Sequence, residues 1–150
     1  MSKSADEGNA QIKYKKMIKK DGKSFIEDLI DTFPAIKEEV SDEDWIGLIH
    51  IQVGCLTLFT QKAIDDNNIP LVLRCFQFVY DNIDIVSSEI ENALVISWVF
   101  HLTFVRNPEL YDLFPPKLKE LRVKLEEWEN NLASTKNEKL KKFLNGAEEY

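Results

Sequence analysis

The sequence predicts an all-α fold, a single-domain antiparallel helical bundle around one buried helix near residues 88–106. Three observations support this prediction. Hydrophobic residues make up 44% of the 150 residues, whereas Gly and Pro number five each, a composition typical of helical domains. Several stretches repeat apolar residues at spacings of three and four, and most of them begin with a helix-capping pattern. Residues 88–106 are apolar on almost every side of a helix, so other helices must surround them.

The start and stop signals predict roughly six to eight helices, as a closed bundle or as stacked helical hairpins. Five start signals are present: Ser24/Glu27, Ser41/Asp44, Ser88/Glu91 and Thr135/Glu138, which are capping boxes, and Asn107-Pro108. The expected helices span residues 24–33, 34–40, 44–66, 70–83, 88–106, 108–114, 118–133 and 138–145. Pro115-Pro116 forces a break before the last two.

Charge divides the chain into three parts. Residues 1–23 carry seven lysines and three acids, residues 24–115 carry four basic and sixteen acidic residues, and residues 116–150 carry eight basic and seven acidic residues. We therefore expect a mobile basic N-terminal segment, residues 1–23, followed by a helical domain, residues 24–150. An acidic domain argues against binding to nucleic acid or to an anionic membrane, since both require clustered cations.

The start of the chain is polar and lysine-rich, with no apolar segment of the kind that directs secretion. No stretch has the roughly 20 apolar residues of a membrane span. We therefore expect a cytoplasmic protein. Cys55 and Cys75 lie in apolar helical runs without metal-site spacing, and in a reducing compartment we expect both to be free thiols.

A narrow polar strip runs along the helix expected over residues 44–66. His50, Thr57 and Gln61 lie in line with Gly47 and Gly54 at spacings of three and four. The strip is a possible ligand or partner groove, in which the glycines would let another backbone approach. The alternative is ordinary helix packing with partly exposed polar groups.

Ser97 and His101 share one face of the helix expected over residues 88–106. A hydrolase would need a nucleophile on a sharp turn, an orienting acid and an oxyanion hole, and no such pattern is visible. The histidines also lack the Glu three residues before them that a di-metal bundle requires, and no calcium loop or glycine-rich phosphate loop is present. We therefore predict no catalytic residues, no metal site and no cofactor, and a protein that is not an enzyme.

Acidic side chains are the remaining chemical theme. They concentrate before the helix expected over 44–66 and at the turns around the next helix, at Glu38, Glu39, Asp42, Glu43, Asp44, Asp65, Asp66, Asp81 and Asp84. Such runs commonly serve solubility and helix-dipole complementarity. As a functional surface they would steer a basic protein partner.

The chain resembles a family of small acidic all-helical bacterial proteins known as a domain of unknown function. The resemblance rests on FIEDLIDTFPAIKEEV at 25–40, the DDNN turn at 65–68, LVLRCFQFVYDNI at 71–83 and ENALVISWVFHL at 91–102, and covers roughly residues 24–113. Domains of this kind are found among immunity proteins of bacterial toxin systems. The resemblance therefore implies protein binding and supplies no catalytic residues.

Three functions follow as hypotheses. The leading one is a non-catalytic cytosolic protein-binding module, an immunity protein that occludes a basic toxin through an acidic face. The second is a small-molecule-binding or enzymatic helical domain that uses the polar strip around His50 and His101. The third is a homo-oligomeric scaffold whose interface is the apolar stripe at residues 118–132.

Overall fold

The computed structural model of the chain describes residues 19–148, with side chains up to residue 145, and residues 1–18 of the expected basic segment lie outside this range. The described part is all-α, as predicted, and contains no named strand. Its elements are α2 (Gly22–Thr32), η1 (Pro34–Ile36), α3 (Lys37–Val40), η2 (Glu43–Trp45), α4 (Ile49–Asp65), α5 (Ile69–Asn82), α6 (Ser88–Leu94), η3 (Val95–Val99), η4 (Pro108–Leu113) and α7 (Pro116–Glu148).

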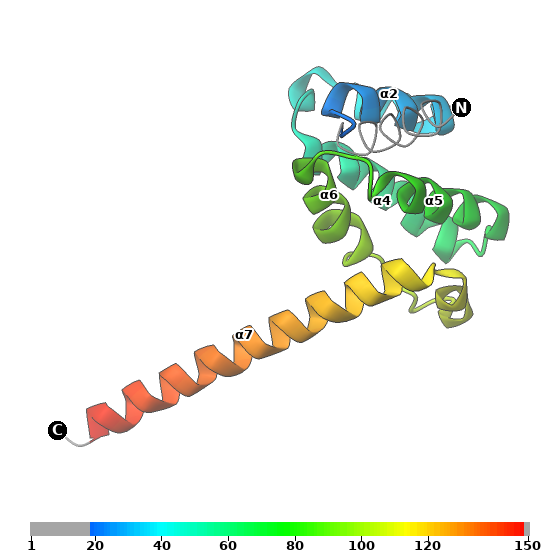
Figure 1. The fold of residues 1–150 in the computed structure, drawn as a ribbon. Helices are drawn as coiled ribbons and strands as arrows, with labels where there is room; N and C mark the ends of the chain where they lie inside the picture. The colour runs from blue at the N-terminus through cyan, green and yellow to red at the C-terminus, as the bar shows by residue number, and fades with distance from the viewer. Residues whose placement is uncertain (1–18, 149–150) are drawn as a thin grey trace, which may run out of the picture.

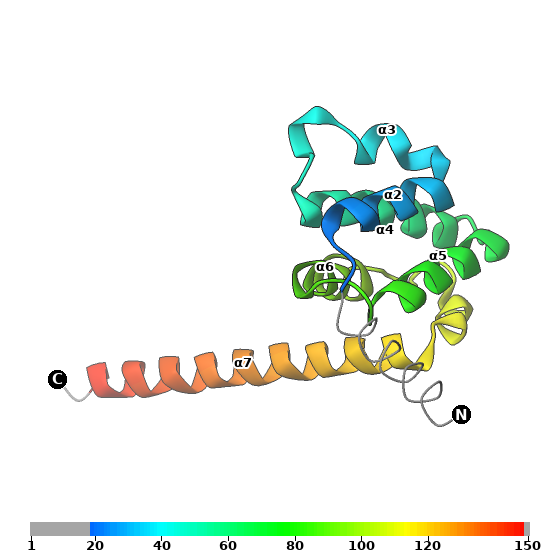
Figure 2. The same ribbon diagram turned by 45° about the horizontal axis from the view of Figure 1, so that its top comes forward.

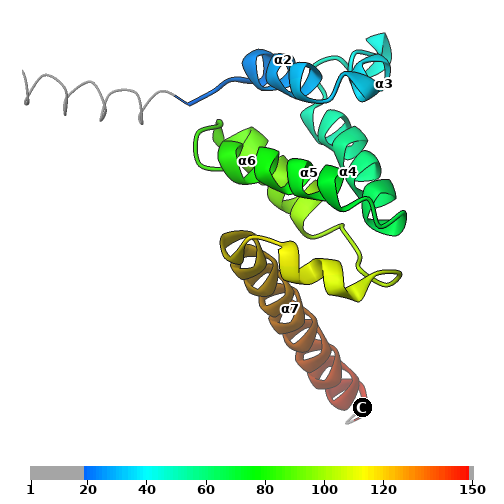
Figure 3. The same cartoon turned by 90° about the vertical axis from the view of Figure 1, so that its right-hand side faces the viewer.

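The helices stack in three levels (Figures 1 and 3). α2 and α3 lie on one side of a central level that α4, α5 and α6 form, and η4 with the first turns of α7 lies on the other side. α4 contacts α5, α6, η1, η2, η3 and α3, so it occupies the centre that the sequence assigned to residues 88–106. Beyond its first turns α7 runs away from the body (Figure 2).

The first helix begins earlier than the Ser24/Glu27 capping box predicts. Asp21 is the N-cap of α2, and its carboxylate accepts a hydrogen bond of 2.9 Å from the backbone N–H of Ser24. The end of the expected mobile segment is also fixed to the domain. Backbone hydrogen bonds join Lys20 to Ile85 and Ser87, and the Lys20 Nζ forms an ion pair with Asp28. The helical domain therefore includes residues 19–23.

The helix predicted over residues 44–66 is split. The carboxylate of Asp42 accepts from the Asp44 N–H at 2.9 Å and starts the 3-10 turn η2. Gly47 then adopts a φ of +84°, a left-handed conformation that glycine tolerates because it has no Cβ. α4 begins only at Ile49. The acidic residues before it therefore belong to a separate turn and not to the first turn of the long helix.

The helix predicted over residues 88–106 stops early. α6 passes into a π-helical turn, η3, in which the Phe100 N–H donates to the Val95 carbonyl at 3.0 Å. Trp98, Val99 and Leu102 are buried as expected. Val105 lies beyond the helix and is 84% exposed, so the apolar run is longer than the buried segment.

The two helices predicted over 118–133 and 138–145 are one helix. α7 continues from Pro116 to Glu148, and the Thr135/Glu138 start signal is unused. The Thr135 hydroxyl instead donates to the Asn131 carbonyl within the helix, at 2.9 Å. No helix of the described part is long and apolar enough to cross a membrane.

The core is a continuous set of apolar side chains in which aromatic rings pack edge to face. Phe76 contacts Trp98 and Phe114, with ring centroids 5.9 and 4.9 Å apart. Both cysteines are free thiols, as predicted. Burial raises the pKa of Cys75 to about 11, so this thiol is a neutral core residue.

Candidate functional site

The polar strip on α4 faces the end of the α6–η3 helix. The Nδ1 of His50 and the Oγ of Ser97 lie 3.2 Å apart and share a hydrogen bond. The Thr57 hydroxyl donates to the Ser97 carbonyl at 2.6 Å. The two polar groups that the sequence suggests as separate sites, one on each helix, therefore meet in one contact.

The rest of the strip serves the same helix end. The Gln61 amide donates to the Thr103 carbonyl at 3.0 Å and accepts from the Thr103 N–H at 2.9 Å. His101 Nδ1 lies 3.2 Å from the Ile96 carbonyl, and Arg122 of α7 donates to the carbonyls of Val99 and Leu102.

These contacts have a common cause. A helix end leaves carbonyl groups without backbone partners, and side chains must satisfy them where water is excluded. Thr57 is buried and Gln61 is half-buried, whereas His50 and His101 are exposed, so the strip combines packing contacts with partly exposed polar groups. Of the alternatives for His50, Thr57, Gln61 and His101, the helix-packing interpretation fits the structure.

His50 and Ser97 lie at the distance expected of a catalytic base and its nucleophile, but the acid that would complete a catalytic triad is missing among the described residues. A catalytic histidine is normally oriented by an acid on its other ring nitrogen. Between residues 19 and 148 no carboxylate hydrogen bonds to the ring of His50. The same range holds no group of three or more His, Cys, Asp or Glu side chains that could bind a metal ion.

The nine acidic residues of the predicted partner surface divide into separate groups. Glu38, Glu39, Asp42, Glu43 and Asp44 lie together on α3 and η2. Asp65 and Asp66 lie at the end of α4, whereas Asp81 and Asp84 lie at the far end of α5. The 14 residues of α5 separate these two pairs by about 20 Å at 1.5 Å per residue. The nine residues therefore do not form one continuous face, and each group is a separate candidate for a partner surface.

The groups also differ in what their side chains do. Asp84 forms an ion pair with Lys117 of α7. Asp65 accepts from Gln61 at 3.0 Å, and Asp81 accepts from Gln77 at 2.7 Å. These three carboxylates take part in the fold. In the α3–η2 group only the Asp42 carboxylate accepts a hydrogen bond among the described residues. The other four side chains are exposed: Glu38, Glu39, Glu43 and Asp44.

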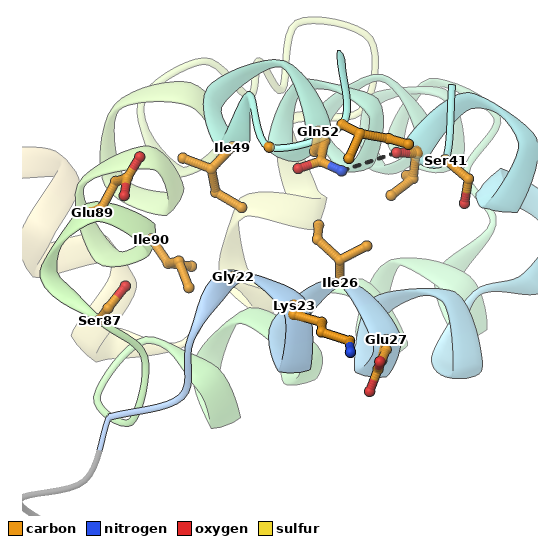
Figure 4. A pocket seen from close by; sticks show the side chains of 13 residues that line it. Gly22, Lys23, Ile26, Glu27, Ser41, Ile49, Gln52, Ser87, Glu89 and Ile90 are labelled. Atoms are coloured by element: carbon orange, nitrogen blue, oxygen red, sulfur yellow. Dashed lines mark hydrogen bonds between the residues drawn. The ribbon is translucent and has the colours of Figure 1, made fainter. Parts of the chain in front are cut away.

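The structure contains an apolar pocket that the sequence pattern does not reveal (Figure 4). Its lining includes Val40 and Ser41, which adjoin the α3–η2 acids in sequence. Its volume is about 510 Å³, and it lies between α2, the segment at residues 40–49 and the start of α6. Five apolar side chains form its walls: Ile26, Val40, Ile46, Ile49 and Ile90. Polar and charged side chains complete the lining, with Lys23, Glu27 and Glu89 among them.

The pocket has one fixed polar wall and one open edge. The Gln52 amide donates to the Val40 carbonyl at 3.0 Å, which holds α4 against the end of α3 (Figure 4). At the opening Ile46 is 65% exposed, and Leu48, two residues along, is 50% exposed. Desolvation raises the pKa of the half-buried Cys55 thiol, and the carboxylates of Glu39 and Asp42 raise it further. Two of the α3–η2 acids therefore act electrostatically on α4.

The sequence could not locate this pocket because its walls come from three separate segments. Ile26 and Ile49 both follow the ordinary apolar spacing of core positions. Only the left-handed Gly47, which turns the chain away before α4 begins, leaves the space between them. A glycine between two apolar residues, Ile46-Gly47-Leu48, was the one local signal of a break.

Comparison with known proteins gives a family and no named relative. No curated protein and no solved structure matches the chain at the significance required. A family model does match, described as "Domain of unknown function (DUF7674)", over residues 26–144. The match extends beyond the region expected from the resemblance, residues 24–113, and takes in most of α7. The chain therefore belongs to the DUF7674 family of domains of unknown function.

Proposed function

We propose that this domain is a non-catalytic protein-binding module that holds a basic partner at the pocket and the α3–η2 acids. The observation that carries the proposal is an open apolar pocket lined by Val40, Ser41 and Ile46, from the same segment of the chain that carries four exposed carboxylates. A partner would insert one apolar side chain between Ile26, Ile49 and Ile90. Its Lys or Arg side chains would lie against Glu38, Glu39, Glu43 and Asp44.

The two parts of this surface have different physical effects. Full burial of one apolar side chain is worth about 1.5–3 kcal/mol, and central anchors of this kind dominate binding energy. Exposed carboxylates mainly raise the association rate and reject acidic proteins. The partner's affinity should therefore depend on the pocket, and the salt dependence of its association rate on the acids.

The finer role that we propose is that of a bacterial immunity protein, which occludes a toxin in the cytoplasm. The net charge of −7 supports a basic target. The use of Thr57, Gln61 and His101 in backbone contacts favours binding over catalysis. An occluding protein needs only a rigid surface that matches its target.

A second candidate is binding of a small apolar molecule in the same pocket. The volume of about 510 Å³ lies within the range of roughly 300–1,000 Å³ for small-molecule sites. The apolar walls and the single ordered amide of Gln52 also fit such a ligand. This candidate replaces the one that placed a ligand at the polar strip of α4.

The test is affinity capture from a lysate of the native cell with four immobilised proteins. These are the wild type, Ile46→Ser in the pocket wall, the double reversal Glu38→Lys with Glu39→Lys, and the double reversal Asp65→Lys with Asp66→Lys as a control. The control makes the same charge change outside the proposed surface. Thermal unfolding of each variant confirms that the domain is folded.

We expect the wild type and the control to retain the same basic protein, and Ile46→Ser and the α3–η2 reversal to lose it. The purified partner should then bind the wild type more weakly as salt rises. A partner that binds all four proteins equally would contradict the proposed surface. If the wild type retains no protein, and an apolar dye binds the wild type but not Ile46→Ser, the second candidate replaces the first.

A further inference from the structure

The distal part of α7 has no partner within the described chain. Near its start, Leu118 is buried in the core and Arg122 donates to the carbonyls at the end of η3. Every residue from 126 to 145 is exposed. These 20 residues correspond to about 30 Å of helix at 1.5 Å per residue. Figures 1 and 2 show this part of α7 running away from the body.

This exposed part carries an apolar stripe. At 100° per residue, one arc of about 120° on an ideal helix contains five large apolar side chains, namely Leu125, Trp128, Leu132, Leu140 and Phe143, and between them the charged side chains of Glu129, Lys136 and Lys139. Trp128 is 59% exposed and Phe143 is 73% exposed. A stripe of this width is typical of a helix that packs against another element.

The middle of the stripe has a low intrinsic helix propensity. Residues 130–137 read NNLASTKN, and Asn, Ser and Thr are weaker helix formers than Ala or Leu. The Thr135 hydroxyl bonds back to the Asn131 carbonyl, which slightly weakens a helix. Packing of an apolar face, and not propensity, holds most helices of this kind, and residues 19–125 do not supply that packing.

Charge along α7 indicates what covers the stripe. Three acids, Glu126, Glu127 and Glu129, precede a block of four lysines, Lys136, Lys139, Lys141 and Lys142, which also contains Glu138. An antiparallel pair of such helices, with its two-fold axis at Ser134, brings each acidic block level with the partner's lysines. The same register places Leu125 level with Phe143 and Trp128 level with Leu140. A parallel pair would set acid beside acid and lysine beside lysine.

We infer that the distal part of α7 pairs antiparallel with α7 of a second copy of this chain. The interface is isologous, so each copy contributes the same stripe and the same two charged blocks. Trp128 is its largest anchor, because large aromatic side chains dominate interface energy. α2, which supplies part of the pocket lining, lies on the other side of the body from α7 (Figure 1), so the pocket remains open in this dimer.

The test is sedimentation equilibrium of the full chain and five variants at concentrations up to about 100 µM. Trp128→Ala should raise the dimer dissociation constant about 30-fold or more, the effect of losing a hot-spot side chain. The acid-to-lysine triple, Glu126→Lys, Glu127→Lys and Glu129→Lys, should raise it at least tenfold, because lysine blocks then face each other. The lysine-to-acid triple, Lys139→Glu, Lys141→Glu and Lys142→Glu, should have the same effect.

The fourth variant joins both triples on one chain, which exchanges the two blocks and should restore the wild-type dimer. The fifth carries the same acid-to-lysine change elsewhere, at Glu38, Glu39 and Glu43, and should dimerise like the wild type. A wild type that is strictly monomeric at the highest concentration would overturn the inference. A dimer that tolerates both triples equally well would overturn the antiparallel register.

Discussion

The hydrogen bond between Trp98 and Thr60 provides the sharpest test of how α4 and η3 are held together. The indole N–H of Trp98 is fully buried and donates to the Thr60 Oγ1 at 3.0 Å. Thr60→Val keeps the side-chain shape and nearly the same helix propensity, but valine cannot accept this bond. A buried donor without a partner costs about 1–3 kcal/mol, so we expect the free energy of unfolding to fall by that amount.

The partner substitution separates this cost from packing. Trp98→Phe removes the donor together with part of the ring, and Thr60 still donates to the Leu56 carbonyl at 2.8 Å. In the double variant no donor is left unpaired. The two changes together should therefore destabilise the protein by at least about 1 kcal/mol less than the sum of the single changes.

The assay is urea unfolding at one protein concentration. It is followed by far-UV circular dichroism and not by tryptophan fluorescence, because Trp98 itself is changed. Thr135→Val on α7 is the matched control, because Thr135 makes the same hydroxyl-to-carbonyl bond at an exposed position. It should change stability by no more than about 0.5 kcal/mol. If Thr60→Val stays within that same limit, the bond to Trp98 does not stabilise the contact and the reasoning is refuted.

Two further predictions concern titratable groups. Thiol alkylation should modify Cys55 well before Cys75, because Cys75 is buried and its pKa is raised to about 11, whereas Cys55 is half-buried; equal rates in peptide mapping across pH 7–9 would contradict this. Hydrogen bonds from the Ser24 N–H and hydroxyl lower the pKa of Asp21 below its usual value of 3.8, so the stabilisation by Asp21 is present above about pH 4 and is lost as pH falls through its folded-state pKa. Asp21→Ala should therefore lower the melting temperature at neutral pH and have a smaller effect near pH 2.5, as differential scanning calorimetry can check.

The fold class and most core positions could be predicted because they depend on local spacing. Phe25 and Leu29 on α2, and Val72, Cys75 and Val79 on α5, are all buried as their three- and four-residue spacing requires. The Pro and Asn residues that begin α5 and η4 also lie where the pattern places them. Hydrophobic periodicity reports burial directly, so these features need no tertiary information.

Helix ends were predicted less well, since several local signals compete at each one. Ser24 and Asp21 can both cap the first helix, and Asp21 does so. Ser41/Asp44 has the spacing of a capping box, yet Asp42 starts a 3-10 turn there and Gly47 delays α4 to Ile49. Where α4 begins depends on two tertiary hydrogen bonds at the end of α3, from Gln52 to the Val40 carbonyl and from Trp45 to the Glu39 carbonyl. Sequence spacing alone does not predict these contacts.

The polar residues show why a site was harder to predict than the fold. A line of His, Thr and Gln on one helix has the same sequence pattern whether it binds a ligand or satisfies another helix end. The deciding fact is the π turn at Val95–Val99, which leaves the carbonyls of Ser97 and Thr103 facing Thr57 and Gln61. A 3.6-residue periodicity does not predict such a turn. The sequence therefore could not show that these carbonyls need side-chain donors.

Two surfaces then remain whose side chains have no comparable role in the fold, the pocket with its α3–η2 acids and the distal stripe of α7. The level of α4, α5 and α6 separates them (Figure 1), and substitutions more than about 10 Å apart without shared partners have additive effects. Ile46→Ser should therefore leave sedimentation unchanged, and Trp128→Ala should leave the intrinsic affinity of the pocket for a partner unchanged. A partner with two binding sites would gain avidity from the dimer, so it would bind the Trp128→Ala monomer more weakly without any change in pocket contacts. Binding measured with an immobilised partner and again in solution distinguishes this avidity effect from damage to the pocket.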